Sequence, residues 1–452
     1  MTKREFRQKM KCGLGRCITA IDSSNMPKYK PIVLWGCINN IAFDTQCEGS
    51  RGIYMHDLAV RFNDDDYFVK PAIDKFLTLP PDADWRRFCH LCDFLQCFAS
   101  DGNKAARQAL KEKYIETYSA LMNTRVSRKA NNICDNYEYL CIDMIQIMKQ
   151  ETFCKIAEDI GGYFSKHRSY NNADLKWRFE WFYIKSCEKF GKKKIRKELE
   201  KRSCDSENIL CFFEVMEYSV PENKQSAKAV PISAYETVER AETGLSMKDI
   251  ISARRSEDNQ KAELARAVIS ENDPEKKAEL LKIFRSSYCR FPLDPEPLFE
   301  YAGSENENLR AAALDVLCYA EGKPVRDFGK KLLEQEKNTA EGLSMLINNY
   351  EKTDKTLLMS SLNNINADNN DNSGWHGVVI TILNAAERKG SLIPPEALMY
   401  IYENSLCSCC RESVLKIMGR RHILTKELLS ECLFDCNTDI REYAKKRLKA
   451  SG

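Results

Sequence analysis

The sequence has no apolar run of about 18 residues, so no membrane-spanning helix is predicted. Residues 1–22 are basic but lack the apolar core of a secretory signal peptide. Lysine and arginine number 69 against 66 aspartates and glutamates, and this near balance excludes a uniformly basic coat for nucleic acid. We therefore expect a soluble, cytoplasmic protein without a membrane partner.

Familiar enzyme motifs are missing as well. The chain contains no phosphate-binding loop of the Walker type, no GxSxG elbow and no HExxH pair. Segments typical of strands are scarce, whereas helical periodicity runs through most of the chain. The sequence favours a non-enzymatic, helical protein that needs no cofactor.

Cysteine, in contrast, is abundant, with 20 residues spread along the chain. Most lie at apolar positions, such as Cys141 and Cys318, where a reduced thiol serves as a small hydrophobic side chain. Two segments, 89–92 and 407–436, combine cysteine with histidine. Because both lie in apolar helical stripes, we predict buried thiols and no metal, with zinc at 407–436 as the alternative.

Apolar pairs recur at nearly constant spacing in the second half. Members of a pair are three residues apart and face the same way on a helix. Successive pairs are 33, 33, 33 and 35 residues apart. This period accommodates two short helices and two turns, the unit of an α-solenoid. The pairs are Leu281 with Phe284, Leu314 with Leu317, Ile347 with Tyr350, Ile380 with Leu383, and Leu415 with Met418.

Three segments, NLRAAALDVL (308–317), CRESVLKIMG (410–419) and TDIREYAKKRL (438–448), resemble the inner-helix start of HEAT-type repeats. The resemblance covers residues 270–452. It implies an all-α, right-handed α-solenoid of HEAT-like helical repeats, with a divergent helical N-terminal half. Arginines recur near the predicted helix starts, and we expect them to bond neighbouring repeats; they are Arg310, Arg411 and Arg441.

The predicted organisation has three parts. Residues 1–218 form a divergent helical N-terminal region, because helical periodicity continues there without a clear repeat length. Residues 219–233 contain two prolines and few apolar side chains, which is typical of a linker or surface loop. Residues 234–452 form the HEAT-like repeat region.

The segment FDTQCEGSRGIYMHDL (43–58) gathers many polar residue types at a corner between two predicted helices. Its acids are suited to capping the following helix, which is one interpretation. The other is a recognition loop in which Arg51 binds a carboxylate or phosphate. We therefore predict a partner-binding site from this corner and from the start of a nearby helix; its residues are Asp44, Gln46, Glu48, Arg51, Tyr54, Trp85 and Arg86.

The segment 175–202 joins an aromatic helix to a basic run. Basic side chains beside aromatic ones suit phosphate contact and base stacking. In the competing interpretation the aromatics are core residues and the lysines a solvated face. The candidate nucleic-acid residues are Trp177, Trp181, Lys192, Lys193, Lys194, Arg196 and Lys197.

We expect a non-enzymatic scaffold whose extended helical surface binds a protein or peptide partner, since such surfaces commonly do so. The alternative is a nucleic-acid-binding solenoid, similar in fold class to the HEAT-like DNA alkylation-repair glycosylases. That resemblance implies a basic concave face with Trp and Asp near the lesion. Trp85 with Asp84, or Trp177 with Asp174, would take those places.

Overall fold

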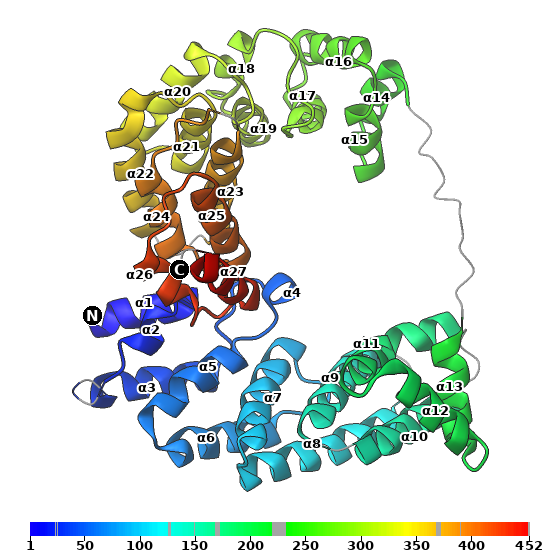
Figure 1. Cartoon of the computed structure of the whole chain (residues 1–452). Helices are drawn as coiled ribbons and strands as arrows, with labels where there is room; N and C mark the ends of the chain where they lie inside the picture. The colour runs from blue at the N-terminus through cyan, green and yellow to red at the C-terminus, as the bar shows by residue number, and fades with distance from the viewer. Residues whose placement is uncertain are drawn as a thin grey trace. The chain divides into compact units, whose positions relative to one another are not determined.

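The computed structural model describes residues 1–22, 24, 26–124, 128–148, 150–167, 172–218, 232–367, 372–388 and 390–450. In these ranges the chain is helical and forms no strand; one isolated antiparallel bridge joins Ser286 to Cys289 (Figure 1). The predicted all-α class is therefore confirmed. Among the described helices, none combines the length and the apolar character that a bilayer crossing requires.

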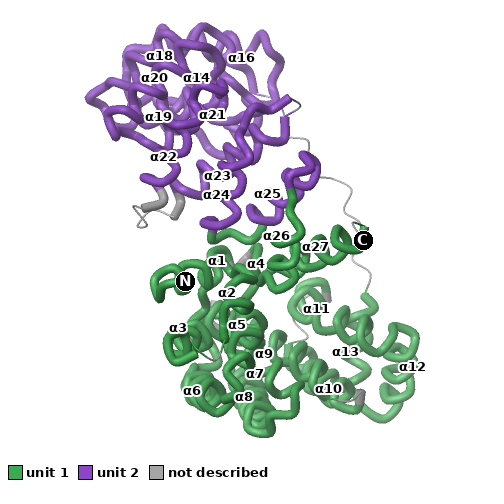
Figure 2. Tube along the Cα trace, turned by 60° about the vertical axis from the view of Figure 1, so that its left-hand side comes forward, with its two compact units in different colours: residues 1–222, 406–409, 424–452 green, residues 223–405, 410–423 purple. Residues whose placement is uncertain are grey.

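The chain divides into two compact units (Figure 2). Unit 1 comprises Met1–Glu222, Leu406–Cys409 and Leu424–Gly452, and unit 2 comprises Asn223–Ser405 and Cys410–Ile423. The prediction kept 234–452 together, whereas contacts place its last residues in unit 1 with the N-terminal helices. Most of the predicted linker, residues 219–231, lies outside the described residues.

Unit 1 consists of helices joined by short turns. They are α1 (Lys3–Cys12), α2 (Arg16–Thr19), α3 (Met26–Cys37), α4 (Thr45–Glu48), α5 (Gly52–Ala59), η1 (Val60–Phe62), α6 (Asp65–Thr78), α7 (Trp85–Ser100), α8 (Lys104–Asn123), α9 (Arg128–Ile147), α10 (Gln150–Lys166), α11 (Asn172–Phe190), α12 (Lys192–Ser203), α13 (Glu207–Glu217), α26 (Lys426–Cys432) and α27 (Thr438–Ala450).

Unit 2 is built in the same way, and the first two residues of its last helix are counted in unit 1. Its elements are α14 (Ala234–Arg240), α15 (Met247–Arg254), α16 (Asp258–Ser270), α17 (Pro274–Leu281), η2 (Lys282–Phe284), α18 (Glu296–Tyr301), α19 (Glu307–Leu317), α20 (Lys323–Glu334), α21 (Thr339–Asn348), η3 (Lys352–Asp354), α22 (Lys355–Ala367), α23 (Asn372–Glu387), α24 (Pro395–Asn404) and α25 (Ser408–Arg420).

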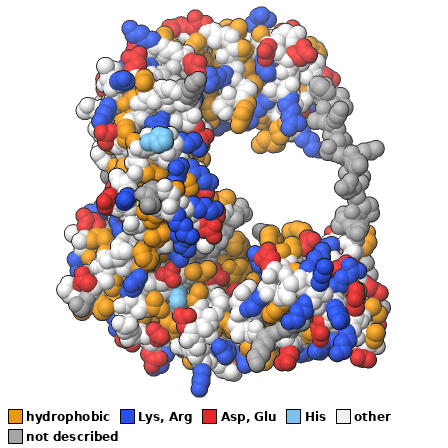
Figure 3. Space-filling model, viewed as in Figure 1, with side chains coloured by type: hydrophobic (Ala, Val, Ile, Leu, Met, Phe, Trp, Pro, Cys, Tyr) orange, Lys and Arg blue, Asp and Glu red, His pale blue; other side chains and the backbone are white. Residues whose placement is uncertain are grey.

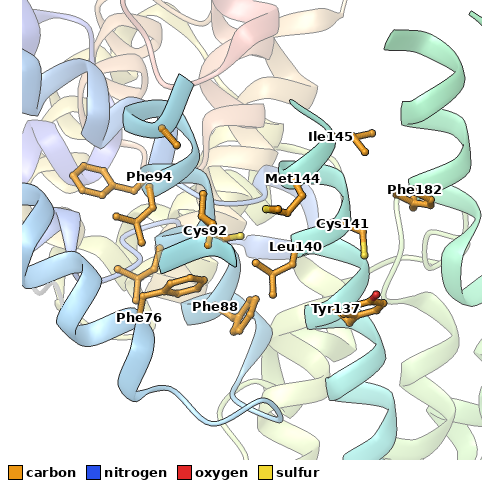
Figure 4. Packing of buried hydrophobic residues seen from close by; sticks show 14 of the residues in the cluster. Phe76, Phe88, Cys92, Phe94, Tyr137, Leu140, Cys141, Met144, Ile145 and Phe182 are labelled. Atoms are coloured by element: carbon orange, nitrogen blue, oxygen red, sulfur yellow. The ribbon is translucent and has the colours of Figure 1, made fainter. Parts of the chain in front are cut away.

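The core of unit 1 is rich in aromatic rings and thiols. Figure 4 shows α7 and α9 contributing Phe88, Cys92, Tyr137 and Cys141 to one continuous cluster. All twenty cysteines are free, and most are buried. This agrees with the prediction of reduced thiols that act as apolar side chains.

Many hydrogen bonds between helices of unit 1 join residues that are 40 to 50 positions apart. Tyr114 donates to Asp159 at 2.6 Å across 45 residues. Ser206 donates to Glu158 at 3.1 Å across 48 residues. Helices that are two positions apart in the chain also contact each other closely, as α7 does with α9 and α11 with α13.

Helices α10 and α13 cross at a glycine. A Cβ atom added at Gly161 would overlap the backbone carbonyl of Asn208, whereas one added at Gly162 would meet its nearest neighbour, Asn208 Nδ2, at 3.4 Å. Only the first glycine is therefore required for the close approach of the two backbones.

The last two helices pack onto the first ones within unit 1. The backbone N–H of Cys436 donates to Gly13 O at 2.9 Å. Arg16 pairs with Glu431 at 2.9 Å, and Arg441 with Asp57 at 2.8 Å. These contacts make the core of unit 1 discontinuous in sequence.

Inter-helix bonds in unit 2 span shorter separations. Asn348 donates to Cys318 O at 2.6 Å across 30 residues, and Arg420 donates to Glu387 at 2.9 Å across 33 residues. The odd-numbered helices from α17 to α23 contact one another in succession.

The predicted apolar pairs fall on α17 with η2, and on or just after the odd-numbered helices from α19 to α25. Eight of the ten side chains are buried. Tyr350 lies just after α21, and Ile380 is 43% exposed. The buried stripe of α23 passes through Val379, Ile382 and Leu383, so Ile380 lies off that stripe.

The recurring arginines make a shared local bond. Arg310 donates to Ser304 O at 2.8 Å, Arg411 donates to Ser405 O at 3.3 Å, and Arg441 donates to Asp435 O. In each case the carbonyl lies six residues earlier in the chain. A side chain in the first turn of a helix points back toward the N-terminus, so the common bond fixes the preceding turn. Bonding between repeats by these arginines stays a prediction.

Candidate functional site

The predicted corner at 43–58 contains a buried ion pair. Arg51 is 2% exposed and pairs with Glu48 at 3.1 Å. Arg51 also donates to Leu406 O at 3.3 Å and to Cys436 Sγ at 2.5 Å. Burial raises the pKa of Glu48, but the Arg51 guanidinium and the backbone N–H of Ser408 together hold that pKa below its usual value.

The corner therefore connects parts of unit 1 that are distant in sequence. Tyr54 is 1% exposed and donates to Leu14 O at 2.8 Å. Asp44 accepts the backbone N–H of Cys47 at 3.4 Å and so caps the short helix α4, not the following helix α5 as predicted. The side chain of Gln46 lies outside the described residues. Arg51 and Tyr54 lie inside the unit, not on a binding surface as expected, because intramolecular acceptors hold both of them.

Two tryptophans that the sequence assigned to different sites line one pocket of unit 1. Trp85 of α7 and Trp181 of α11 border a cavity of about 350 Å³. Helix α9 contributes two carboxyl groups to the lining, those of Asp135 and Glu138. The volume lies within the range typical of small-ligand pockets.

The start of α7 positions Trp85. Asp84 caps this helix by accepting the backbone N–H of Arg86 at 2.9 Å, so Trp85 is the first helical residue. Trp85 is half-buried and the neighbouring Arg86 is exposed. Asp84 therefore acts as a cap, and it is not among the residues that line the pocket.

A kink in α11 positions Trp181. Phe179 has φ −134° and ψ 18°, which interrupts the helical hydrogen-bond ladder. The N–H of Phe182 donates instead to Glu138 Oε1 at 3.1 Å, so Glu138 caps the second half of α11. Trp181 lies in the first turn after the kink and is 60% exposed.

Both pocket carboxyl groups have perturbed acidity. Burial raises the pKa of Glu138 to about 7, although the backbone N–H groups of Phe182 and Trp181 oppose the shift. Burial also raises the pKa of Asp135, against the opposing charge of Arg178. Glu138 therefore changes its charge near neutral pH in a pocket that two indole rings also line.

A second pair of carboxyl groups lies behind the pocket wall. Tyr139, which lines the pocket, donates to Asp93 at 3.0 and 3.1 Å. Burial raises the pKa of Asp93 to about 6. Burial and the charge of Asp93 together raise the pKa of Asp143 well above its usual value. Asp93 holds the hydroxyl of Tyr139 on the buried side of the wall, and neither Asp93 nor Asp143 is among the residues that line the pocket.

An exposed apolar stripe runs along α11 beside the pocket. Trp177, Trp181 and Ile184 are 75%, 60% and 36% exposed, and they follow the i, i+4, i+7 spacing of one helix face. Large exposed aromatics on one face are unusual outside interaction surfaces. The interpretation of Trp181 and Ile184 as core residues is therefore wrong.

The basic run lies on α12, where Ile195 and Leu199 face the core. Arg196 pairs with Glu200 at 3.0 Å and with Glu217 at 3.6 Å. In Figure 3 basic side chains gather over the part of unit 1 where α12 lies. The exposed lysines of this helix are Lys192, Lys193, Lys194, Lys197 and Lys201.

The cysteine–histidine segments have structural contacts. His90 lies within 2.9 and 3.1 Å of the carbonyls of Gly36 and Cys37, and burial lowers its pKa to about 4. Cys89 and Cys92 are buried beside it. At the other segment, Cys436 contacts Arg51 and the backbone of Gly13.

Sequence reasoning found Trp85 and Trp181 but not their common pocket, and it missed Asp135 and Glu138. In α9 these acids look like ordinary polar positions of an amphipathic helix, and only the burial of Glu138 sets it apart. The expected pairing of Trp177 with Asp174 lies outside the pocket. Comparison with protein-family models, curated proteins and solved structures found no match to this chain.

Proposed function

We propose that the protein is a non-enzymatic scaffold in which stacked helical repeats present a binding surface to a protein or peptide partner. The regular separation of inter-helix bonds supports this arrangement: about 30 residues in unit 2 and about 45 in unit 1. The proposal includes the right-handed HEAT-like solenoid for unit 2 and longer, divergent repeats for unit 1.

The observation that carries the proposal is the convergence of Trp85 and Trp181 on one pocket, beside the exposed stripe of α11. Tryptophan dominates binding hot spots because it buries a large apolar area at low entropic cost. Indole faces together with Asp135 and Glu138 favour a cationic group. The partner's lysine or arginine side chain would enter the pocket while its apolar residues cover Trp177.

Tryptophan fluorescence tests this proposal directly. A panel of synthetic peptides, each with one central lysine among apolar residues, is titrated into the protein, alongside the same peptides carrying acetyl-lysine. Trp181→Ala should abolish the response to the lysine peptides, whereas Ile115→Ala, at a 67% exposed position of α8, should leave it intact. Equal binding of acetylated peptides would reject the cationic ligand, and no binding by any peptide would reject the proposal.

A nucleic-acid partner is the second candidate, because Trp85, Trp181 and two acids meet in one pocket and α12 exposes five lysines. This combination is similar in kind to what the glycosylase resemblance implies. Binding to duplex or single-stranded DNA should then fall steeply with salt. Charge reversal at Lys192, Lys193 and Lys194 should abolish DNA binding and leave peptide binding unchanged.

A further inference from the structure

Unit 2 contains a second concave surface that the proposed function does not use. It is a groove of about 970 Å³ formed by Tyr350, by residues of η3 and of α22 to α25, and by residues of the turns beside them. Five basic side chains line it, against two carboxylates. The basic residues are Lys352, Lys355, Arg388, Arg420 and Arg421; the acids are Glu387 and Glu396.

The two acids already have cationic partners within the groove. Lys355 pairs with Glu396 at 2.6 Å, and Arg420 pairs with Glu387 at 2.9 Å. Among the residues that the structure describes, the remaining cations have no carboxylate within ion-pair distance. They are Lys352, Arg388 and Arg421, so the groove has an excess of positive charge after its internal pairs are formed.

Backbone and amide oxygens hold two of these guanidinium groups in place. Arg421 donates to Ile393 O and to Ala386 O, both at 2.8 Å, and Arg388 donates to Asn348 Oδ1 at 2.9 Å. Neutral acceptors fix the orientation of a guanidinium without neutralising its charge. Burial lowers the pKa of Arg421, which agrees with a partly desolvated cation that lacks a counter-ion.

The groove also has an apolar wall. Leu392 is 46% exposed, and it is followed in the lining by Ile393 and by the rigid pair Pro394 and Pro395. A ligand that fits this surface must offer carboxylates to the fixed guanidiniums and apolar groups to the wall. A continuous phosphate backbone fits less well, because it has no apolar groups to place against Leu392 and the two prolines.

We propose that this groove binds an acidic peptide segment of a partner protein, with carboxylates on Arg388, Arg421 and Lys352 and an apolar side chain against Leu392. Arginine suits this task because its planar guanidinium donates two parallel hydrogen bonds to one carboxylate. The site lies entirely in unit 2 and does not depend on the tryptophan pocket of unit 1.

The test uses fluorescence anisotropy with the full chain and a labelled 12-residue peptide that alternates glutamate and leucine. Arg388→Gln and Lys352→Gln change exposed side chains, so folding should be preserved, as circular dichroism can check. Each should weaken binding about tenfold, as expected for the loss of one charge-assisted contact. Lys248→Gln, an exposed position in α15, is the control and should leave affinity unchanged.

Three results would overturn the proposal. The first is equal affinity for the peptide in which glutamine replaces glutamate, because the carboxylates would then be irrelevant. The second is an equal loss on Lys248→Gln, because attraction would then be non-specific. The third is tighter binding of an oligothymidine than of the acidic peptide at the same salt concentration, which would assign the groove to nucleic acid instead.

Discussion

Glu48, the last residue of α4, and Arg51, the residue before α5, form an ion pair inside unit 1, with side chains that are 0% and 2% exposed. Glu48 also accepts the backbone N–H groups of Phe43 at 2.9 Å and Asp44 at 3.1 Å. Both members of the pair therefore have further hydrogen-bond partners, and the pair fixes the turn that precedes α5. Removal of either partner would leave the other as an unpaired buried charge.

Arg51→Ala should lower the free energy of unfolding by about 3–5 kcal/mol, because Glu48 would remain buried without its partner. Urea denaturation followed by circular dichroism measures the change. The double substitution Glu48→Gln with Arg51→Met should cost less, since it removes both charges and retains a side-chain acceptor. A single variant that keeps full stability would show that the pair contributes nothing.

Gly161→Ala should destabilise unit 1 by about 3 kcal/mol, because the new methyl group would overlap the carbonyl of Asn208 and backbone cannot yield. Gly162→Ala is the matched control one residue away. It has room for a Cβ and gains up to about 1 kcal/mol of helix propensity. Thermal unfolding distinguishes the two variants. Equal Tm values would mean that α10 and α13 have room for a methyl group where they cross at Gly161.

Stability should depend on pH through Glu138. Its pKa is raised from 4.5 to about 7, so between these values the folded state binds more protons than the unfolded state. The free energy of unfolding must then fall as pH rises through this window. Glu138→Gln should flatten that slope and still cap α11, while Glu214→Gln, at an exposed position of α13, serves as control.

The same group gives the proposed ligand site a pH profile. Only the ionised carboxylate attracts a cation, so affinity for lysine peptides should increase as pH rises through about 7. Fluorescence titration at pH 6 and pH 8 measures it. A wild-type affinity that does not change with pH would contradict the assignment. So would an equal increase of affinity with pH in Glu138→Gln.

Removal of residues 424–452 should destabilise unit 1 selectively. Contacts of α26 and α27 with Gly13, Arg16 and Asp57 would be lost, and the apolar surface beneath them would be exposed to water. We expect one calorimetric transition to move to lower temperature while that of unit 2 stays in place. A single unchanged transition would show that these helices are dispensable.

Much of the fold was accessible from sequence because helix periodicity is local. Apolar pairs such as Leu314 with Leu317 mark buried helix faces regardless of their neighbours. Polar residues are harder to interpret: the sequence favours a surface position for Arg51, and two of the acceptors that bury it lie 355 and 385 positions away in the chain. Burial of a charge is a tertiary property.

The tryptophan pocket illustrates the same limit. Trp85 and Trp181 are each conspicuous, yet no periodicity links α7 with α11. Helix α11 contains no glycine or proline from which the kink at Phe179 could be predicted. That kink frees the N–H of Phe182, which donates to Glu138. A pattern of residue types predicts which side chains are unusual, but their convergence depends on how three helices pack.

The discontinuous core of unit 1 has a consequence for biosynthesis. Helices α1, α2 and α5 leave the ribosome early, whereas α26 begins at Lys426, with 366 residues between it and the end of α5 at Ala59. At elongation rates of roughly 5–20 residues per second, the early helices wait about 20–70 s for their last packing partners. Throughout that delay the nascent chain carries an uncovered apolar face, which is the kind of surface that chaperones shield.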